Sequence, residues 1–182
     1  VAFIPPSFRT WKQTGINPFT FGKEDTAHNY IGFIMKLLIA LLFFMTLVYS
    51  LSHRLYNYLL PVWYLENQFV VIAGLAIIHV ALIWIMIAQF QMSNSWRIGI
   101  DEENKTQLVT KGIFSISRNP IFFGMIGTVL GLFLILPNAL SFFLTLTSYF
   151  IIQIQIRLEE EFLERQHGEA YKNYKSKTRR LI

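Results

Sequence analysis

The sequence predicts an all-α, polytopic membrane helical bundle with about four spans and an amphipathic C-terminal helix. Hydrophobic residues make up 53% of the 182 residues and charged residues 15%, a balance typical of membrane proteins. The apolar runs at 30–51 and 69–92 are long enough, as helices, to cross a hydrocarbon core of about 30 Å. The first residues, from Val1, are apolar, and a count of five spans follows if a further helix precedes them.

Residues 1–92 are predicted to form an N-terminal unit that holds an interfacial segment and the first two spans. Residues 1–29 are rich in Pro and Gly and include aromatic side chains, which is typical of irregular chain at headgroup depth. The first span follows at 30–51. Residues 52–68 form a short aromatic connection that Pro61 interrupts, and they lead into the second span.

Cysteine and histidine usage argues against a metal site. The chain has no Cys, and its four His residues are scattered without the spacing of metal ligands. His79 lies near the middle of the span at 69–92, where an ionisable residue is a functional candidate. We nevertheless favour a neutral His79 that is bonded to a neighbouring helix.

Residues 93–182 are predicted to form the functional core, which comprises a polar loop at 93–117, a helical hairpin and a cytosolic tail. The hairpin joins spans at 121–136 and 139–156 through a tight Pro-Asn turn, and we expect it to be closely packed. Three glycines lie on one face of its first helix and predict close helix packing there: Gly124, Gly127 and Gly131.

The distribution of basic residues predicts the orientation. Arg54 is the one basic residue between the first two spans, whereas the N-terminal segment, the polar loop and the tail hold nearly all of the 16 Lys and Arg. The positive-inside rule therefore places those three segments, and an active site among them, on the cytosolic side. The net charge of +5 suits anionic membrane lipids. We do not expect nucleic acid as a partner, because the aromatic residues lie in apolar runs.

The stretch LVTKGIFSISRNPIFFG, residues 108–124, joins the polar loop to the third span. Asn is a favoured helix N-cap and Pro is favoured at the first helical position, so Asn119 and Pro120 predict that a helix begins here. Its free backbone N–H groups lie at the positive end of the helix dipole. With Arg118 beside it, this helix start suits an anion such as a cofactor carboxylate. An ordinary capped helix with a snorkelling Arg is an equally weighted alternative.

The fourth span is predicted to continue out of the membrane through three glutamates. At about 100° per residue, Glu159 and Glu160 can face the bundle. Glu161 is then expected to pair outward with Arg157 or Arg165. A solvated charged face explains this run, and so does a site that holds a cationic ligand opposite the Arg-bearing helix start.

The 108–124 stretch, the hairpin, the glutamates and the following Gly168, Tyr171 and Tyr174 together resemble a known family. They are similar to the integral-membrane methyltransferases grouped with isoprenylcysteine carboxyl methyltransferase and the phospholipid N-methyltransferases. The resemblance covers about residues 96–182. It implies that S-adenosyl-L-methionine binds on the cytosolic side between the loop, the third span and the glutamate helix. The two tyrosines would then cover this site or anchor the tail.

The resemblance also implies roles for individual residues. Methyl transfer from a sulfonium is an in-line displacement that needs alignment and exclusion of water but no metal. The implied catalytic residues are Arg157, which would pair with a carboxylate or phosphate, and Glu159 and Glu160, which would orient the acceptor or take up its proton. The implied cofactor-binding residues are Gln107, Leu108, Val109, Gly112, Phe114, Arg118, Asn119, Pro120 and Phe122.

The sequence departs from the family pattern at four positions. Asn119 stands where the eukaryotic enzymes have His, and Phe114 and Phe122 stand where Tyr is usual. Gln155 stands where the prenylcysteine enzymes carry an Arg four residues before the glutamate pair, so a prenylcysteine carboxylate is not implied as the substrate.

The function predicted from these features is S-adenosylmethionine-dependent methylation of a hydrophobic or amphiphilic acceptor at the cytosolic membrane face. The acceptor would be a lipid, a prenylated molecule or another small apolar compound. Two other functions remain open. One is an NADPH-dependent membrane sterol or steroid reductase, which shares an Arg-x-Pro element, and the other is a non-catalytic membrane module that binds lipid.

Overall fold

The computed structural model describes Lys12 and residues 26–92 and 108–182. Within these residues the secondary structure is helical, apart from two isolated β-bridges. The α-helices in chain order are α2 (Ala27–Leu51), α3 (His53–Asn57), α4 (Gln68–Met92), α5 (Pro120–Ile135), α6 (Ala139–His167) and α7 (Glu169–Lys177). Two short 3-10 helices, η1 (Trp63–Leu65) and η3 (Gly112–Ser115), lie in the connections.

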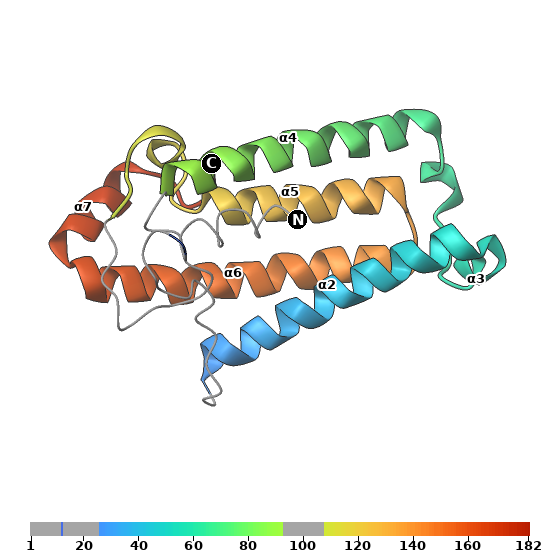
Figure 1. Ribbon diagram of the computed structural model, residues 1–182, viewed down its shortest axis with the longest axis horizontal. Helices are drawn as coiled ribbons and strands as arrows, with labels where there is room; N and C mark the ends of the chain where they lie inside the picture. Colours follow the sequence, from blue (N-terminus) through green and yellow to red (C-terminus); the bar gives the residue numbers. More distant parts are fainter. Residues whose placement is uncertain (1–11, 13–25, 93–107) are drawn as a thin grey trace.

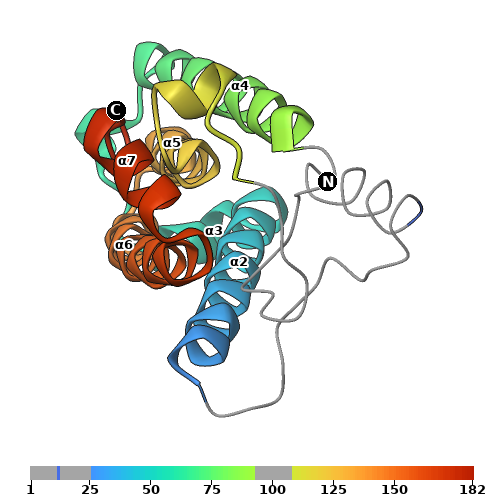
Figure 2. The same ribbon diagram turned by 90° about the vertical axis from the view of Figure 1, so that its left-hand side faces the viewer.

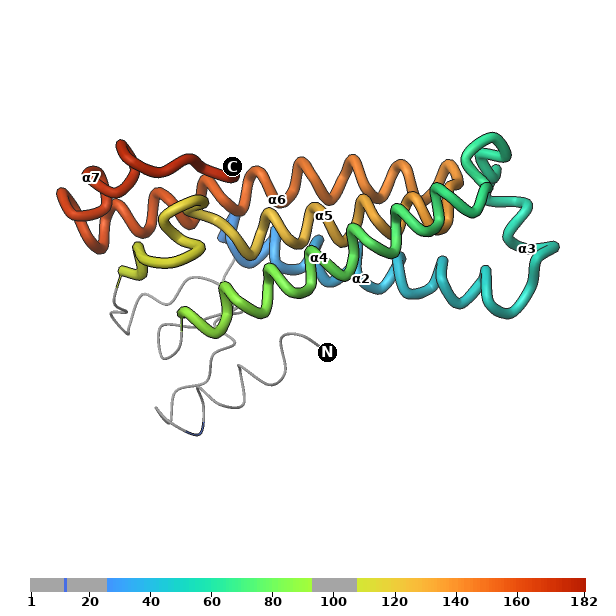
Figure 3. Tube along the Cα trace, turned by 90° about the horizontal axis from the view of Figure 1, so that it is seen from above, coloured from blue at the N-terminus to red at the C-terminus, as the bar shows by residue number. Residues whose placement is uncertain are grey.

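The four longer helices run roughly along one axis and form an elongated bundle (Figures 1 and 3). Among the described residues, α2, α4 and α6 are long and apolar enough to cross a membrane. The 16 residues of α5 extend about 24 Å, which is shorter than a typical hydrocarbon core. The predicted all-α membrane bundle is confirmed, with α5 as its short member.

The glycine face of α5 packs against α4 (Figure 1). A Cβ atom on Gly131 would lie 2.8 Å from the carbonyl oxygen of Gly74, and one on Gly74 would lie 2.7 Å from that of Gly131. Gly124 faces Ile85 of α4 in the same way. The predicted packing role of the glycines is therefore confirmed. Their partner, however, is α4 and not α6, the other helix of the predicted hairpin, because the hairpin turn does not decide which face of α5 meets which neighbour.

A neutral polar joint closes the end of the bundle where α6 begins. Asn138 is fully buried and caps α6, since its Oδ1 accepts a bond of 2.9 Å from the Ser141 N–H. The Ser141 Oγ accepts a bond of 3.0 Å from the Asn138 N–H in return. The carbonyl of Pro137 accepts a bond of 2.8 Å from the Val62 N–H, which joins the α3–α4 connection to this turn.

His79 lies on an exposed face of α4. Its Nδ1 is 2.7 Å from the carbonyl oxygen of Leu75, one turn earlier in the same helix. A carbonyl can only accept, so Nδ1 carries the proton and donates it. The prediction of a bond to a neighbouring helix was wrong, because the ring satisfies itself within its own helix.

Candidate functional site

The start of α5 lies at the same end of the bundle as the C-terminal part of α6, α7 and the end of the chain (Figure 2). The helix begins as predicted, with Asn119 at the N-cap position and Pro120 in the first turn. The Asn119 side chain does not cap it, however. Its Nδ2 instead donates bonds of 3.1 Å to Glu160 Oε1 and 3.1 Å to the Arg180 carbonyl. The side chain therefore joins three segments of the chain at this point.

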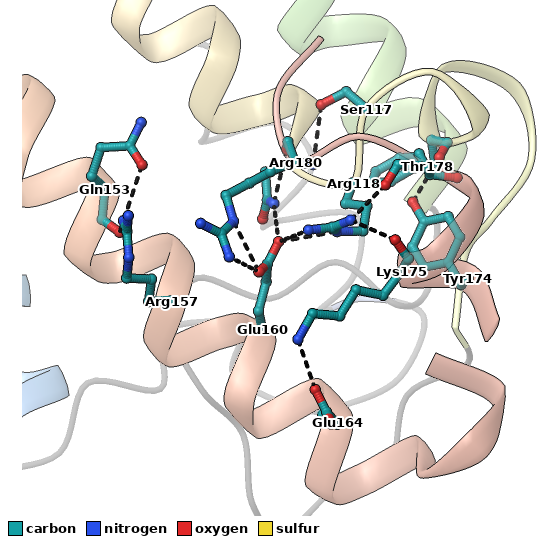
Figure 4. Close-up of polar contacts among 12 residues, drawn as sticks. Ser117, Arg118, Gln153, Arg157, Glu160, Glu164, Tyr174, Lys175, Thr178 and Arg180 are labelled. Carbon is teal, nitrogen blue, oxygen red and sulfur yellow. Dashed lines mark hydrogen bonds and ion pairs between the residues drawn. The ribbon is translucent and has the colours of Figure 1, made fainter. Parts of the chain in front are cut away.

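Arg118 links the start of α5 to α6 and to the chain that follows α7 (Figure 4). Its Nε and Nη2 donate bonds of 3.1 and 3.0 Å to Glu160 Oε1. Its Nη1 donates to the carbonyl oxygens of Lys175 and Thr178. The Arg118 side chain is 8% exposed, and its guanidinium group is bonded on both sides by groups of the protein itself.

Glu160 lies at the centre of a cluster that we call the charged joint, which consists of Arg118, Asn119, Glu160 and Arg180. Its side chain is 4% exposed, and Oε2 accepts a hydrogen bond of 3.0 Å from Nε of Arg180 and forms an ion pair of 2.9 Å with Nη2 of the same residue. Its Oε1 takes the bonds from Arg118 and Asn119. A buried carboxylate is tolerated when its lone pairs are satisfied by charged donors, and here two guanidinium groups and one amide do so. Sequence reasoning missed Arg180, because nothing local in the tail indicates a partner 20 residues back along the chain.

The chain that follows α7 returns to the start of α5. Arg179 forms a parallel bridge with Ser117, and its carbonyl accepts a bond of 2.9 Å from the Arg118 N–H. The buried Tyr174 hydroxyl donates a bond of 2.6 Å to the Phe114 carbonyl in η3. Burial raises the pKa of Tyr174 to about 12, so the phenol stays protonated and keeps this bond. Tyr174 therefore anchors α7 on η3.

Several of the predicted cofactor-binding residues gather in and before η3. Phe114 is buried in a cluster with Ile113 and Ala88, and Val109 and Trp84 pack against that cluster. Leu108 and Phe122 are half-buried. Gln107 lies outside the described residues.

A positive φ and a close approach of the Gln91 side chain fix Gly112 in this region. Its φ is +64°, a conformation that favours glycine, and a Cβ atom there would overlap the Gln91 side chain. Gln91 Oε1 accepts a bond of 2.9 Å from the Ile113 N–H, which ties η3 to the end of α4.

The glutamates of α6 point to different neighbours. Glu159 is half-buried, and its Oε1 accepts a bond of 3.3 Å from Gln155 Nε2, away from the charged joint at Glu160. Glu161 is exposed, and among the described residues it forms no ion pair with Arg157 or Arg165. The predicted outward pair was therefore wrong.

Arg157 lies on an exposed face of α6, where Gln153 of the same helix satisfies it. Its Nη1 donates bonds of 2.6 Å to the Gln153 carbonyl and 3.1 Å to the Gln153 Oε1 (Figure 4). A surface groove of about 390 Å³ runs beside it along α6 and α7. The groove contains three of the glutamates and four basic side chains: Glu160, Glu161, Glu164, Arg157, Arg165, Lys175 and Arg180. It shares Arg157 and Glu160 with the predicted catalytic set and contains none of the predicted cofactor-binding residues.

The model of the phospholipid methyltransferase family, PEMT, matches residues 68–170, which is more than half of the chain. This chain belongs to the phospholipid methyltransferase family. The match confirms the predicted membership among membrane methyltransferases. None of the curated proteins matches the chain.

The part of this phospholipid methyltransferase that matches the family model begins at the first residue of α4 and ends just inside α7. It includes Arg118, Asn119 and Glu160 of the charged joint, together with η3. The match leaves out α2 and Arg180. The charged joint therefore connects residues inside the matched range to Arg180, which lies outside it.

Proposed function

We propose that this protein transfers a methyl group from S-adenosylmethionine to a hydrophobic or amphiphilic acceptor at the cytosolic face of the membrane. The observation that carries the proposal is the family match, because it covers α4, η3, α5 and α6. These are the elements that meet at the charged joint and at the Phe114 cluster. We therefore place the proposed active site at the end of the bundle where those elements converge.

Two buried donors support a cofactor beside the Phe114 cluster. Trp84 Nε1 and Gln89 Nε2 have no hydrogen-bond partner among the described residues, and Trp84 packs against that cluster. A buried donor without a partner is costly, so a ligand rich in acceptor atoms is favoured there. The adenine, ribose and carboxylate of S-adenosylmethionine offer such atoms, so the residues of this region fit the cofactor.

The residues that would hold the cofactor follow from this placement. Val109 and Phe114 would contact its apolar and aromatic parts, and the aromatic ring of Phe122 would favour a cation. When bound, S-adenosylmethionine supplies an electrophilic methyl group on a sulfonium. The protein's own contribution is to align the acceptor and to exclude water, since the reaction needs no covalent intermediate with a side chain.

Acid–base and electrostatic roles remain with the α6 side chains. We propose that Glu159 orients the acceptor or takes up its proton, because it is half-buried and uses only one described hydrogen bond. Arg157 would pair with an acidic group of the acceptor from the interfacial groove. Arg118 and Glu160 hold each other, and we propose that they keep α5, α6 and the C-terminal end in the geometry that the cofactor needs.

The test is calorimetric titration of the detergent-purified protein with S-adenosylhomocysteine and, separately, with NADPH. The proposal predicts saturable binding of S-adenosylhomocysteine and none of NADPH. Binding of NADPH alone would support the reductase alternative, and binding of neither would support a non-catalytic lipid-binding module. Transfer of a tritiated methyl group into the lipid extract then identifies the class of acceptor.

A further inference from the structure

A short stretch of chain, residues 178–180, lies across the start of α5 (Figure 4). We call it the strap. The Arg179 carbonyl accepts a bond of 2.9 Å from the Arg118 N–H, and the Arg180 carbonyl accepts one of 3.1 Å from Asn119 Nδ2. The Thr178 carbonyl accepts a bond from Arg118 Nη1. These three contacts use main-chain oxygens of the strap, so they do not depend on its side chains.

The strap is attached less firmly than the helix before it. α7 is anchored by the buried rings of Tyr171 and Tyr174, whereas the strap contains no apolar side chain. Thr178, which ends α7, has an extended backbone, and the Arg179 side chain is exposed. A segment held by hydrogen bonds with little apolar burial opens locally at a lower free energy than a packed helix. We therefore expect the strap to open about the end of α7 while α7 stays in place.

Arg180 attaches the strap through its side chain. Its guanidinium bonds to Glu160 Oε2, whereas Arg118 and Asn119 both donate to Oε1 of the same carboxylate. The Arg180 side chain is 38% exposed, against 8% for Arg118. Arg180 can therefore leave the carboxylate from the surface while Glu160 keeps its other two donors. Its departure releases the strap and leaves the bond between α5 and α6 in place.

The strap covers residues that the cofactor is expected to contact. Arg118 and Asn119 both belong to the predicted cofactor-binding set, and the strap bonds to both of them. The groove along α6 and α7 contains Arg180 but neither of these two residues. From the side of this groove, a ligand reaches them only after the strap has moved.

The Tyr171 hydroxyl is an unused polar group beside the charged joint. Tyr171 is 1% exposed, and its hydroxyl has no hydrogen-bond partner among the described residues. Burial raises the pKa of Tyr171, and the Glu160 carboxylate adds to this rise, so the hydroxyl keeps its proton. A buried donor without an acceptor costs free energy, and an acceptor atom of a ligand admitted beneath the strap would relieve that cost. This favours a strap that opens for a ligand over one that only closes the fold.

We propose that the strap is a lid on the cofactor site and that Arg180 is its latch. The lid opens about the end of α7 to let the cofactor enter or leave, and it closes again over Arg118 and Asn119. Such a lid sets the rate of ligand exchange without taking part in methyl transfer. The passage of a cofactor rests on the proposed function, whereas the opening of the strap and its dependence on Arg180 do not.

The first experiment measures the opening without a ligand. The Arg118 N–H is bonded to the strap, so its hydrogen exchange, followed by NMR on the 15N-labelled full chain in detergent, reports the open population. Loss of a partly exposed ion pair changes such a population by up to about fivefold. We expect Arg118 to exchange about fivefold faster in Arg180→Ala than in the wild type, and at an intermediate rate in Arg180→Lys.

Arg179→Ala is the matched control, because it removes the same charge from the neighbouring position. The exposed Arg179 side chain makes no bond to the described residues, and its carbonyl keeps the bond to Arg118. This variant should leave the exchange of Arg118 unchanged. The Ile116 N–H, which bonds to the Ile113 carbonyl and not to the strap, reports any wider loss of structure. Equal Arg118 exchange in the two alanine variants, or an equal acceleration at Ile116, would overturn the proposal.

The second experiment measures the exchange of S-adenosylhomocysteine by stopped-flow Trp fluorescence. Arg180 holds the lid shut with or without a ligand, so Arg180→Ala should raise the association and dissociation rates by the same factor, about fivefold, and leave Kd unchanged. A strap that only supports the site would give weaker binding in this variant, and a strap that competes with the ligand would give tighter binding. Either result, or unchanged rates, would overturn the lid.

The two experiments also separate this inference from the proposed function. If S-adenosylhomocysteine binds and Arg180→Ala leaves both rates unchanged, the lid fails alone. If it does not bind to the wild type, the proposed function fails. In that case faster Arg118 exchange in Arg180→Ala still supports the latch, and unchanged exchange overturns it.

Discussion

The two ends of the bundle contain buried polar joints of opposite kinds. At one end Asn138 and Ser141, which are three residues apart, form two reciprocal hydrogen bonds, and neither side chain is charged. At the other end Glu160 is held by Arg118 and Arg180, and the bonds span α5, α6 and the end of the chain. Burying charge costs several kcal/mol more than burying an amide or a hydroxyl, and apolar packing of similar volume often does as well. The neutral joint is explained by folding alone. The charged joint suggests a requirement beyond folding, and we propose that the requirement is cofactor binding.

The largest expected difference between the two ends is their side of the membrane. The chain has no Cys, so single cysteines can be introduced at the exposed positions Lys111, Lys172 and Asn57. A membrane-impermeant maleimide applied to intact cells should label Asn57→Cys fully and leave the other two unlabelled, and inverted vesicles should give the reverse. Labelling of Lys111→Cys and Lys172→Cys from opposite sides would contradict the common face on which the charged joint depends.

The charged joint should dominate the stability differences. Glu160→Ala leaves the buried Arg118 guanidinium without its carboxylate, beside the partly exposed Arg180, and removing one partner of a buried ion pair typically costs ~3–5 kcal/mol of unfolding free energy. Thermal unfolding in detergent should show a clearly lowered midpoint. Glu161→Ala is the control, since it changes an exposed neighbour and should stay within about 0.5 kcal/mol of the wild type. Equal midpoints for the two variants would show that the joint contributes nothing.

The neutral joint should contribute less. Asn138→Ala removes the cap of α6 and leaves the Ser141 N–H without its acceptor, so we expect a loss of about 1–2 kcal/mol in unfolding free energy. The same thermal assay measures it. A loss as large as that of Glu160→Ala would remove the contrast between the two ends.

The smallest effect is expected at the edge of the charged end. Tyr174→Phe deletes the hydroxyl that donates to the Phe114 carbonyl, for which we expect about 1 kcal/mol. Amide hydrogen exchange should become faster in α7 and remain unchanged in α4. Unchanged exchange in α7 would mean that the aromatic packing of Tyr171 and Tyr174, and not this bond, anchors the helix.

What could be predicted from the sequence was local. The start of α5 follows from the Asn-Pro pair, and the spans follow from continuous apolar runs, because both signals lie within a few residues. The partners of these elements could not be predicted in the same way. Asn119 bonds to residues 41 and 61 positions away. A favoured N-cap residue was therefore diverted from capping by long-range contacts that leave no local pattern.

The same limit explains the glutamates. Helical periodicity allowed Glu159 and Glu160 to face the bundle, yet it could not say that Glu160 would meet two arginines while Glu159 met an amide. Glu161 was expected to pair along its own helix with Arg157 or Arg165, but Arg157 is satisfied by Gln153 one turn earlier. Exposed pairs at such spacings contribute only a few tenths of a kcal/mol, so a competing local bond readily replaces them.

The most direct test of the account is the affinity for S-adenosylhomocysteine of Glu160→Gln and Asn138→Ala beside the wild type, measured by calorimetry well below their unfolding midpoints. Both variants disturb a buried polar joint, at opposite ends of the bundle. We expect at least about tenfold weaker binding by Glu160→Gln, corresponding to ~1.4 kcal/mol, and unchanged binding by Asn138→Ala. Equal affinities in all three proteins, or no binding by the wild type, would contradict a cofactor site at the charged end.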